Sequence, residues 1–319
     1  MSGMDPTPAV PPVPVGSVAC KRHPNVQTML RCTRCGDPIC PDCMRPAAVG
    51  YQCPSCARGA KQEIHRPAQQ VTAVAPGRGL TLTNVILLIL VAMYGIEVAL
   101  GGIGSFVNGP SVDVLVRLGA SLGYARLAHG TPIIGIAAGQ EWRLATSIFL
   151  HGSLIHLAMN GYALWAFGNI VEQEIGRARY MAIFVVGGLF ASTASFVFGL
   201  YYRPGVGASG AIFAILGAFL GYAWRRRELA FYQARIRNVL VLIVINAFVA
   251  IGISSIDWRA HVGGFIAGLV LGLAVDGFKG RERSPAVFVV ACVLLLVVAA
   301  IGVVTHGAAL RALYGPPGA

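Results

Sequence analysis

Four polar side chains lie within three apolar segments: His156 and Asn160 in residues 145–167, Ser209 in 209–224, and His261 in 260–277. A serine hydroxyl is a weak nucleophile until a base takes its proton, and a histidine on another segment can be that base. We therefore interpret Ser209 as a nucleophile and His261 as its general base. The alternative for each residue alone is a polar contact between helices, or helix packing by the glycines around Ser209.

A second set of polar groups suits the stabilisation of an oxyanion. His156 and Asn160 are four positions apart, so they share one face of a helix. Both side chains can donate hydrogen bonds, as can the backbone N–H of Ser209 at the start of its helix. Small residues such as Gly210 and Gly264 allow the segments that carry Ser209 and His261 to approach closely.

Near the N-terminus, seven cysteines and a histidine form four closely spaced pairs: Cys20 with His23, Cys32 with Cys35, Cys40 with Cys43, and Cys53 with Cys56. Eight such ligands are enough for two tetrahedral zinc sites with none left over. Disulfides are the alternative, but they would leave an odd cysteine, and iron–sulfur ligation is another. We expect two structural zinc ions, and a module too small to fold without them.

The composition defines the class of the protein. The chain has 319 residues, of which 55% are hydrophobic and only 12% charged, and this predicts an all-α polytopic membrane protein. The net charge of +12 does not indicate a nucleic-acid partner, because the basic residues are distributed between apolar segments. Seven segments are candidate membrane spans: residues 80–100, 145–167, 180–200, 209–224, 238–254, 260–277 and 286–305.

Lysine and arginine residues predict the orientation. With the N-terminus in the cytoplasm, nineteen of them lie on the cytoplasmic side and six on the other. The second, fourth and sixth spans then run in the same direction, from outside to inside. Their polar starts meet at one depth in the outer leaflet, and polar groups inside a bilayer indicate a functional site. We expect a multi-pass protein of a bacterial plasma membrane.

The same motifs resemble those of rhomboid intramembrane serine proteases. The resemblance covers residues 80–276, and its motifs are Trp142-Arg143, His151 with His156 and Asn160, Gly207-Ala208-Ser209-Gly210, and Ala260-His261-Val262-Gly263-Gly264. It implies a six-helix core with a Ser209–His261 dyad in a water-filled cavity. It also implies that His156 and Asn160 form the oxyanion hole, and that Trp142 and Arg143 belong to a lateral loop outside the chemistry. His151, Gly207 and Gly210 are expected to support the site.

The cysteine pattern is similar to that of a B-box-type zinc finger, whose pairs interleave. This implies one site from Cys20, His23, Cys40 and Cys43, and another from Cys32, Cys35, Cys53 and Cys56. Spacing alone leaves the pairing open. The module could bind another protein, self-associate, regulate the membrane core, or contact anionic lipid headgroups through its basic residues.

These observations predict a domain order. We expect a disordered proline-rich tail without the apolar stretch of a signal peptide (1–18), a two-zinc module (19–58) and a linker (59–79). A six-helix catalytic core (80–277), a seventh transmembrane helix (286–306) and a short tail (307–319) follow.

The expected function is an intramembrane serine endopeptidase that needs no catalytic cofactor. It would cleave transmembrane protein substrates near their outer ends. The alternatives are a catalytically silent relative that binds or escorts membrane helices, and a transporter, which would distribute polar residues along a path.

Overall fold

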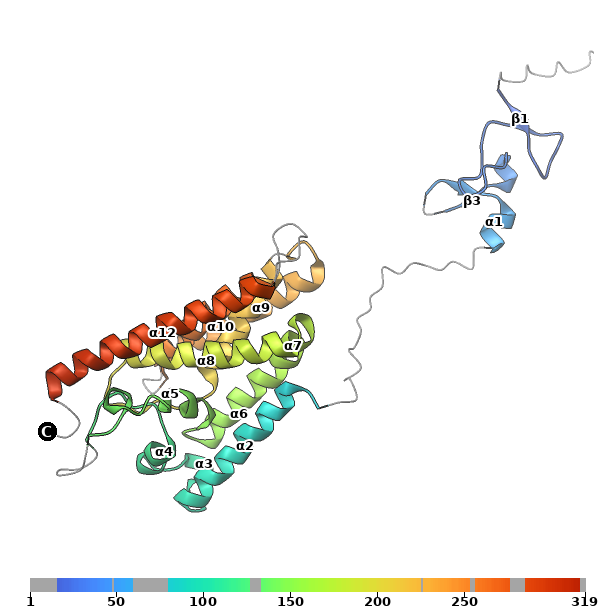
Figure 1. Ribbon diagram of the computed structural model, residues 1–319. Coiled ribbons are helices and arrows are strands. Elements are labelled where there is room, and N and C mark those ends of the chain that lie inside the picture. The colour runs from blue at the N-terminus through green and yellow to red at the C-terminus, as the bar shows by residue number, and fades with distance from the viewer. Residues whose placement is uncertain are drawn as a thin grey trace, which may run out of the picture. The chain divides into compact units, whose positions relative to one another are not determined.

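The computed structural model describes residues 16–47, 49–59, 80–126, 133–224, 226–252, 256–275 and 285–315 (Figure 1). The chain divides into two compact units, Met1–Arg78 and Gly79–Ala319. Most of the expected proline-rich tail and of the expected linker lies outside the described residues. The domain boundaries drawn from the sequence stay predictions.

The first unit is built from short elements: β1 (Val18–Ala19), β2 (Gln27–Thr28), η1 (Pro41–Cys43), β3 (Arg45–Pro46), β4 (Tyr51–Gln52) and α1 (Pro54–Gly59). β1 pairs with β2 and β3 with β4, both antiparallel. Its buried cluster consists of five cysteines and Ile39. So few aliphatic side chains cannot stabilise a module of this size, and cross-links or metal ions must contribute.

The second unit is helical. Its elements are α2 (Leu82–Gly101), α3 (Ser105–Asn108), α4 (Val112–Leu118), η2 (Ile136–Ala138), α5 (Arg143–Thr146), η3 (Ser147–Phe149), α6 (Leu154–Ala163), η4 (Leu164–Gly168), α7 (Asn169–Ile175), α8 (Arg177–Phe198), α9 (Ser209–Trp224), α10 (Ala230–Gly252), α11 (Trp258–Val275) and α12 (Pro285–Tyr314). η4 is a π-helical turn that joins α6 and α7 into one continuous helix.

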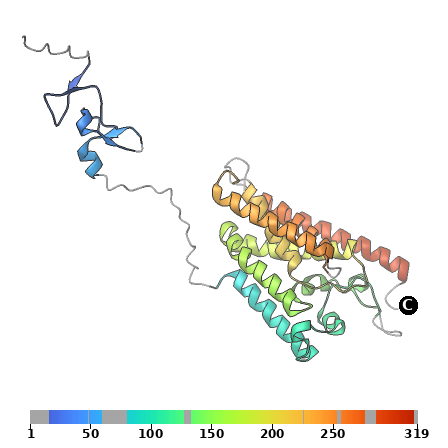
Figure 2. The same ribbon diagram turned by 180° about the vertical axis from the view of Figure 1, so that it is seen from behind.

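Among the described residues, four helices are long and apolar enough to cross a membrane: α2, α8, α11 and α12. α9 is equally apolar but has only 16 residues, so it is about 24 Å long and shorter than a bilayer core of roughly 30 Å. Residues 211–219 of α9 are all buried, because α8, α10 and α11 pack around it. α12 lies along α8 and α11 at one side of the bundle (Figures 1 and 2).

The second span does not begin where the sequence predicted. The expected start at residue 145 is wrong, because residues 143–149 form two short turns and the helix begins only at Leu154. The apolar side chains of Leu144, Ile148 and Leu150 are buried within the connection. The hydroxyl of Ser153 accepts the backbone N–H of His156, which sets the start of α6.

The start of α2 is held by a carboxylate on another helix. Glu172 of α7 is buried and accepts the backbone N–H groups of Leu82 and Thr83, both at 2.9 Å. These N–H groups have no partner inside their own helix, so a buried helix end needs this acceptor. Glu172 thereby ties the first helix of the bundle to the second.

Candidate active site

Ser209 and His261 are brought together from two helices. Ser209 is the first residue of α9, and His261 lies in the first turn of α11. The Nε2 atom of His261 is 2.9 Å from the Oγ atom of Ser209. This distance allows the imidazole to accept the hydroxyl proton, which is the geometry of an activated nucleophile.

Glycines allow this distance because α9 and α11 touch through their backbones. A Cβ atom at Gly264 would lie 2.0 Å from the carbonyl oxygen of Gly210, and one at Gly268 would lie 1.9 Å from that of Ala214. Real Cβ atoms do not approach so closely, so a side chain at either position would push the helices apart. The small residues noted in the sequence thus set the separation between Ser209 and His261.

The imidazole of His261 is also held by a ring that the sequence analysis did not single out. Phe213 stacks on it with ring centroids 4.3 Å apart and an angle of 9° between the planes. Phe213 follows Ser209 by four residues, so both side chains lie on the same face of α9. That spacing was the only signal in the sequence that could have identified it.

Asp257 is a further residue that sequence reasoning missed. Its Oδ1 atom accepts the backbone N–H groups of Arg259 at 3.1 Å and Ala260 at 3.3 Å, so it caps the helix that carries His261. The hydroxyl of Ser195 on α8 donates to the same carboxylate. The signal in the sequence was an aspartate just before an apolar helix.

His156 and Asn160 lie beside Gly207, two residues before Ser209. A Cβ atom at Gly207 would be 2.8 Å from Cε1 and Nε2 of His156 and 3.6 Å from Nδ2 of Asn160. Gly207 has a φ of 127°, a conformation that favours glycine. Its N–H donates to the carbonyl of Ser147 at 2.9 Å, which holds the segment before α9 in place.

His151 lies beside Asn160 and contacts its side chain. It is fully buried, and its Nε2 atom is 3.1 Å from Nδ2 of Asn160. Because an amide nitrogen can only donate, His151 accepts this hydrogen bond. The backbone N–H of His151 donates to both carboxylate oxygens of Glu97 on α2, at 3.1 and 3.3 Å. Glu97 is a fully buried acid within an apolar helix, and the sequence analysis overlooked it.

Trp142 and Arg143 have a different environment. The guanidinium of Arg143 is buried and donates to the carbonyls of Val116 at 2.7 Å and Ala120 at 3.1 Å. It also lies 4.7 Å from the centre of the Trp142 ring, and that ring is half exposed. These contacts organise the connection between α2 and α5.

The comparisons with known proteins identify the family of this chain. The family model described as "Rhomboid domain" matches residues 138–277. The putative rhomboid protease YdcA of Bacillus subtilis is 30% identical over 149 residues, which cover 47% of this chain and 74% of YdcA. The chain belongs to the rhomboid family. Together with the four long apolar helices among the described residues, this membership identifies an integral membrane protein.

Two other rhomboid relatives match over a smaller share of their length. The rhomboid protease GluP of Bacillus subtilis is 42% identical over 160 residues, which cover 49% of this chain and 31% of GluP. The RHOMBOID-like protein 5 of Arabidopsis thaliana is 35% identical over 171 residues, covering 52% of this chain and 51% of that protein. This chain therefore spans only about a third and a half of these two relatives. The matched rhomboid domain contains Ser209, His261, His156 and Asn160, and it leaves out the cysteine pairs and α12.

Two groups in the first unit could hold metal ions: Cys20, His23, Cys40 and Cys43, and Cys32, Cys35, Cys53 and Cys56. In each group the four ligand atoms lie within 4.8 Å of one another. These are the interleaved sets that the B-box resemblance implied. All eight cysteines of the chain are free thiols, so these pairs do not form disulfides here.

The spacing of the ligand atoms fits tetrahedral zinc. The Sγ atoms of Cys20 and Cys43 are 3.9 Å apart, as are those of Cys35 and Cys53. A tetrahedral ion with Zn–S bonds of about 2.3 Å places two sulfurs roughly 3.8 Å apart. The Nδ1 atom of His23 lies 3.2 Å from the sulfur of Cys40, which suits a shorter Zn–N bond.

The electrostatics of the first group also favour a cation. Burial opposes ionisation of the Cys20 thiol, but backbone hydrogen bonds, first among them that of Cys40, lower its pKa to about 6. Burial and the neighbouring thiols raise the pKa of Cys43 to about 11. One thiolate therefore forms readily and the next is suppressed, unless a dication compensates the charge.

Proposed function

We propose that this rhomboid-family chain is an intramembrane serine endopeptidase that uses a Ser209–His261 dyad. The observation that carries the proposal is the 2.9 Å separation between Oγ of Ser209 and Nε2 of His261, two residues 52 positions apart. The relatives GluP, a rhomboid protease, and YdcA, a putative rhomboid protease, support the same reaction class.

In the proposed mechanism, Nε2 of His261 takes the proton of the Ser209 hydroxyl while Oγ attacks the carbonyl carbon of a peptide bond. The carbonyl oxygen becomes an oxyanion. The imidazolium then gives its proton to the leaving amine as the C–N bond breaks, and an acyl-enzyme remains. Water attacks the ester carbonyl, His261 accepts its proton, and the acid product leaves as Oγ is reprotonated.

We assign the oxyanion hole to the side chains of His156 and Asn160 and the backbone N–H of Ser209. The side chains of His156 and Asn160 lie beside Gly207, two residues before Ser209, and this supports the assignment. His151 holds the amide of Asn160 at 3.1 Å, so the donor is oriented before substrate arrives. Donors that are fixed in advance stabilise developing charge without reorganisation.

We propose that no carboxylate completes a triad. The Asp257 carboxylate is already bonded to two backbone N–H groups of α11 and to the hydroxyl of Ser195. Its role would be to position the helix and its histidine. His261 is instead oriented by the stacked ring of Phe213.

The expected substrates are transmembrane helices weakened by small or helix-breaking residues near their outer ends. Water must enter from the side at which α9 begins, since a hydrocarbon core excludes it. The N-terminus and the two-zinc module would then be cytoplasmic, in a bacterial plasma membrane. Both zinc ions would be structural.

The test is cleavage of a fluorescent single-span substrate by the full-length protein in liposomes. Ser209→Ala and His261→Ala should each lower the rate by roughly 10³-fold or more. Thr305→Ala is the matched control, because it removes a hydroxyl that bonds the Ile301 carbonyl on α12, outside the matched domain. It should cleave like the wild type.

A fluorophosphonate probe separates the alternatives. An activated Ser209 should react with the probe, and His261→Ala should abolish the labelling. Cleavage by Ser209→Ala at the wild-type rate would refute the dyad. A folded protein with neither labelling nor cleavage would instead support the silent helix-binding relative, and crosslinking would then identify its bound partners.

A further inference from the structure

The last helix of the chain is longer than a membrane span requires. α12 has 30 residues and is therefore about 45 Å long, whereas a bilayer core is roughly 30 Å thick. It packs against α8 and α11, and its C-terminal end lies beside η2, in the connection between α2 and α5 (Figures 1 and 2). The matched family model ends at residue 277, so the family match does not account for these contacts.

Arg311 binds this connection through its guanidinium group. The Nη1 atom of Arg311 donates to the carbonyl oxygen of Ala137 in η2 at 2.8 Å. The helix itself touches the same residue, because a Cβ atom at Gly307 would lie 3.7 Å from Ala137. Leu310 is buried in one apolar cluster with Ile136 and Ala137. The last turns of α12 therefore fix η2 by a hydrogen bond and by packing.

Tyr314, the last residue of α12, contacts two tyrosines from different parts of the chain. Its ring centroid is 5.1 Å from that of Tyr201, which follows α8, and 6.4 Å from that of Tyr124. The hydroxyl of Tyr201 donates to the hydroxyl of Tyr314 at 2.8 Å. The hydroxyl of Tyr124 donates to the carbonyl oxygen of Gly315. The end of α12 thus joins the connection before α5 to the segment after α8.

These two segments are also bonded to each other through their backbones, close to the candidate active site. The N–H of Gly123 donates to the carbonyl oxygen of Tyr201 at 2.8 Å. Ser121 and Gly205 exchange two hydrogen bonds, at 2.9 and 2.7 Å. Gly205 is four residues before Ser209. A shift of the bonded segments would therefore reach the proposed nucleophile within a few residues.

The segment before Ser209 has little support of its own. Residues 199–208, between α8 and α9, form no helix or strand. Their position depends on the contacts above and on the N–H of Gly207, which donates to the carbonyl of Ser147. A displacement of about 1 Å in a reacting group can lower a rate about 10²-fold. The position of Ser209 is therefore sensitive to whatever holds this segment.

We propose that Arg311 and Tyr314 are positioning residues for the candidate active site. Through Ala137 and Tyr201 they hold the segment that leads to Ser209, and they do not touch the substrate. The kinetic effect rests on the proposed peptidase function, whereas the hold on the segment can be measured without it. In this account α12 belongs to the catalytic unit and is more than an added membrane anchor.

The kinetic test uses the full-length protein in liposomes with a fluorescent single-span substrate. Thermal unfolding first gives a temperature at which every variant is folded. At that temperature, Arg311→Ala together with Tyr314→Ala should lower kcat about tenfold with little change in KM, because the change acts on Ser209 and not on substrate binding. Arg311→Lys together with Tyr314→Phe should restore most of the rate, because lysine also donates to a carbonyl and phenylalanine keeps the ring contact.

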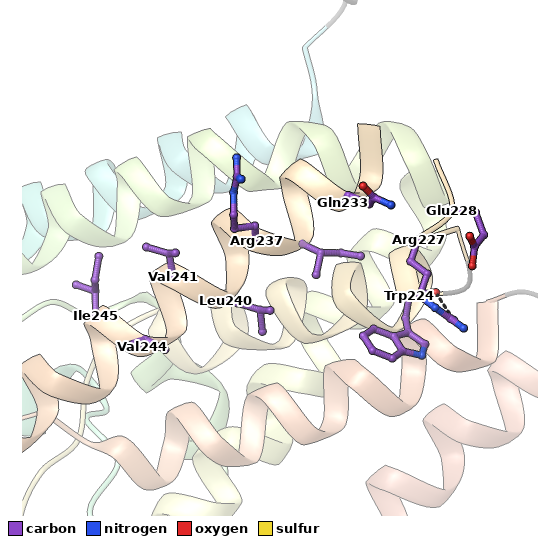
Figure 3. A pocket seen from close by; sticks show the side chains of 10 residues that line it. Trp224, Arg227, Glu228, Gln233, Arg237, Leu240, Val241, Val244 and Ile245 are labelled. Carbon is purple, nitrogen blue, oxygen red and sulfur yellow. Dashed lines mark hydrogen bonds between the residues drawn. The ribbon is translucent and has the colours of Figure 1, made fainter. Parts of the chain in front are cut away.

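Arg227→Ala is the matched control. Arg227 also donates its Nη1 to a backbone carbonyl, that of Trp224 at 3.1 Å (Figure 3). Trp224 is the last residue of α9 and Ser209 the first, so this bond lies at the end of the helix away from the proposed nucleophile. The variant should cleave like the wild type.

Hydrogen exchange measures the hold on the segment directly. The N–H groups of Gly205 and Gly207 donate to the carbonyls of Ser121 and Ser147, so they should be protected in the wild type. In the double alanine variant they should exchange about tenfold faster, while the amides of α2 keep their rates and serve as the reference. Arg227→Ala should leave all of these rates unchanged.

Unchanged exchange at Gly205 and Gly207 in the double alanine variant would overturn the proposal, even if the melting temperature falls. Faster exchange with an unchanged kcat would also overturn it, because the segment would then be held without positioning Ser209. If the wild type does not cleave, the proposed function fails and hydrogen exchange alone decides whether α12 holds the segment. If the double alanine variant does not fold, Arg311→Ala alone decides by the same measurement.

Discussion

At the scale of single residues, Gly207 shows how little room the site leaves. A methyl group there would stand 2.8 Å from His156, on a backbone with φ of 127°. Gly207→Ala should therefore displace the segment before Ser209 and lower kcat by about 10²-fold. Gly205→Ala is the control, because its Cβ would meet atoms only at 3.7 Å and beyond. Substrate cleavage kinetics provide the measurement, and equal rates in the two variants would contradict this account.

Asp257 provides a second residue-scale prediction. Asp257→Ala removes the cap of α11 and the partner of Ser195, which should cost about 1 kcal/mol and disturb the position of His261. We expect kcat to fall with little change in KM. Asp257→Asn should restore most of the activity, because asparagine caps helices as well as aspartate does. If Asn is as inactive as Ala, the negative charge itself matters and the dyad assignment must be revised.

At the scale of elements, the packing of α9 against α11 determines whether Ser209 and His261 meet. Gly268→Ala would place a methyl group 1.9 Å from the Ala214 carbonyl oxygen, so it should destabilise the bundle by about 1–3 kcal/mol. Gly95→Ala on α2 meets no atom within 4 Å and should be neutral or stabilising, since alanine favours helix. Thermal unfolding in detergent measures both. Similar melting temperatures would show that the α9–α11 contact is not tight.

Another element-scale prediction concerns the tie between α2 and α7. Glu172→Gln keeps the size of the side chain but weakens acceptance of the N–H groups of Leu82 and Thr83. We expect a loss of about 1–3 kcal/mol of stability. Glu141→Gln is the control, because Glu141 is exposed. Proteolysis of the α2 start, followed by mass spectrometry, would locate the loosening, and an unchanged cleavage pattern would contradict the capping role.

At the scale of the whole molecule, the chain consists of two units with different sources of stability. The second has a core of buried apolar side chains, whereas the first has a small cysteine-rich core with two groups of Cys and His residues that could hold metal ions. Chelation should therefore unfold the first unit and leave the melting of the second unchanged. Metal analysis should find two zinc ions per chain, one in Cys20→Ser, and two in the control Cys292→Ser. A wild-type protein that folds fully without metal would contradict this.

The sequence alone was enough to predict an integral membrane protein of the rhomboid family, and it drew attention to the residues of both candidate sites. Hydrophobic runs, charge asymmetry and cysteine spacing are local properties, and they suffice for membrane helices and for ligand pairs. They gave the wrong start for the second membrane span. Leu144 and Ile148 are apolar because they are buried in the short turns before α6, and an apolar run alone does not specify a long helix. They also gave no sign that Glu97 and His151 would meet across two segments.

Only the tertiary structure decided which residues touch. The 2.9 Å between Ser209 and His261, the stacking of Phe213 and the bond from Ser195 to Asp257 all depend on how α8, α9 and α11 pack. The sequence could place Ser209 and His261 at one depth, since depth follows from topology and rise per residue. It could not predict how each helix is rotated about its axis or how far apart the two side chains lie. Both depend on backbone contacts at Gly210, Gly264 and Gly268, and these form only when the helices pack together.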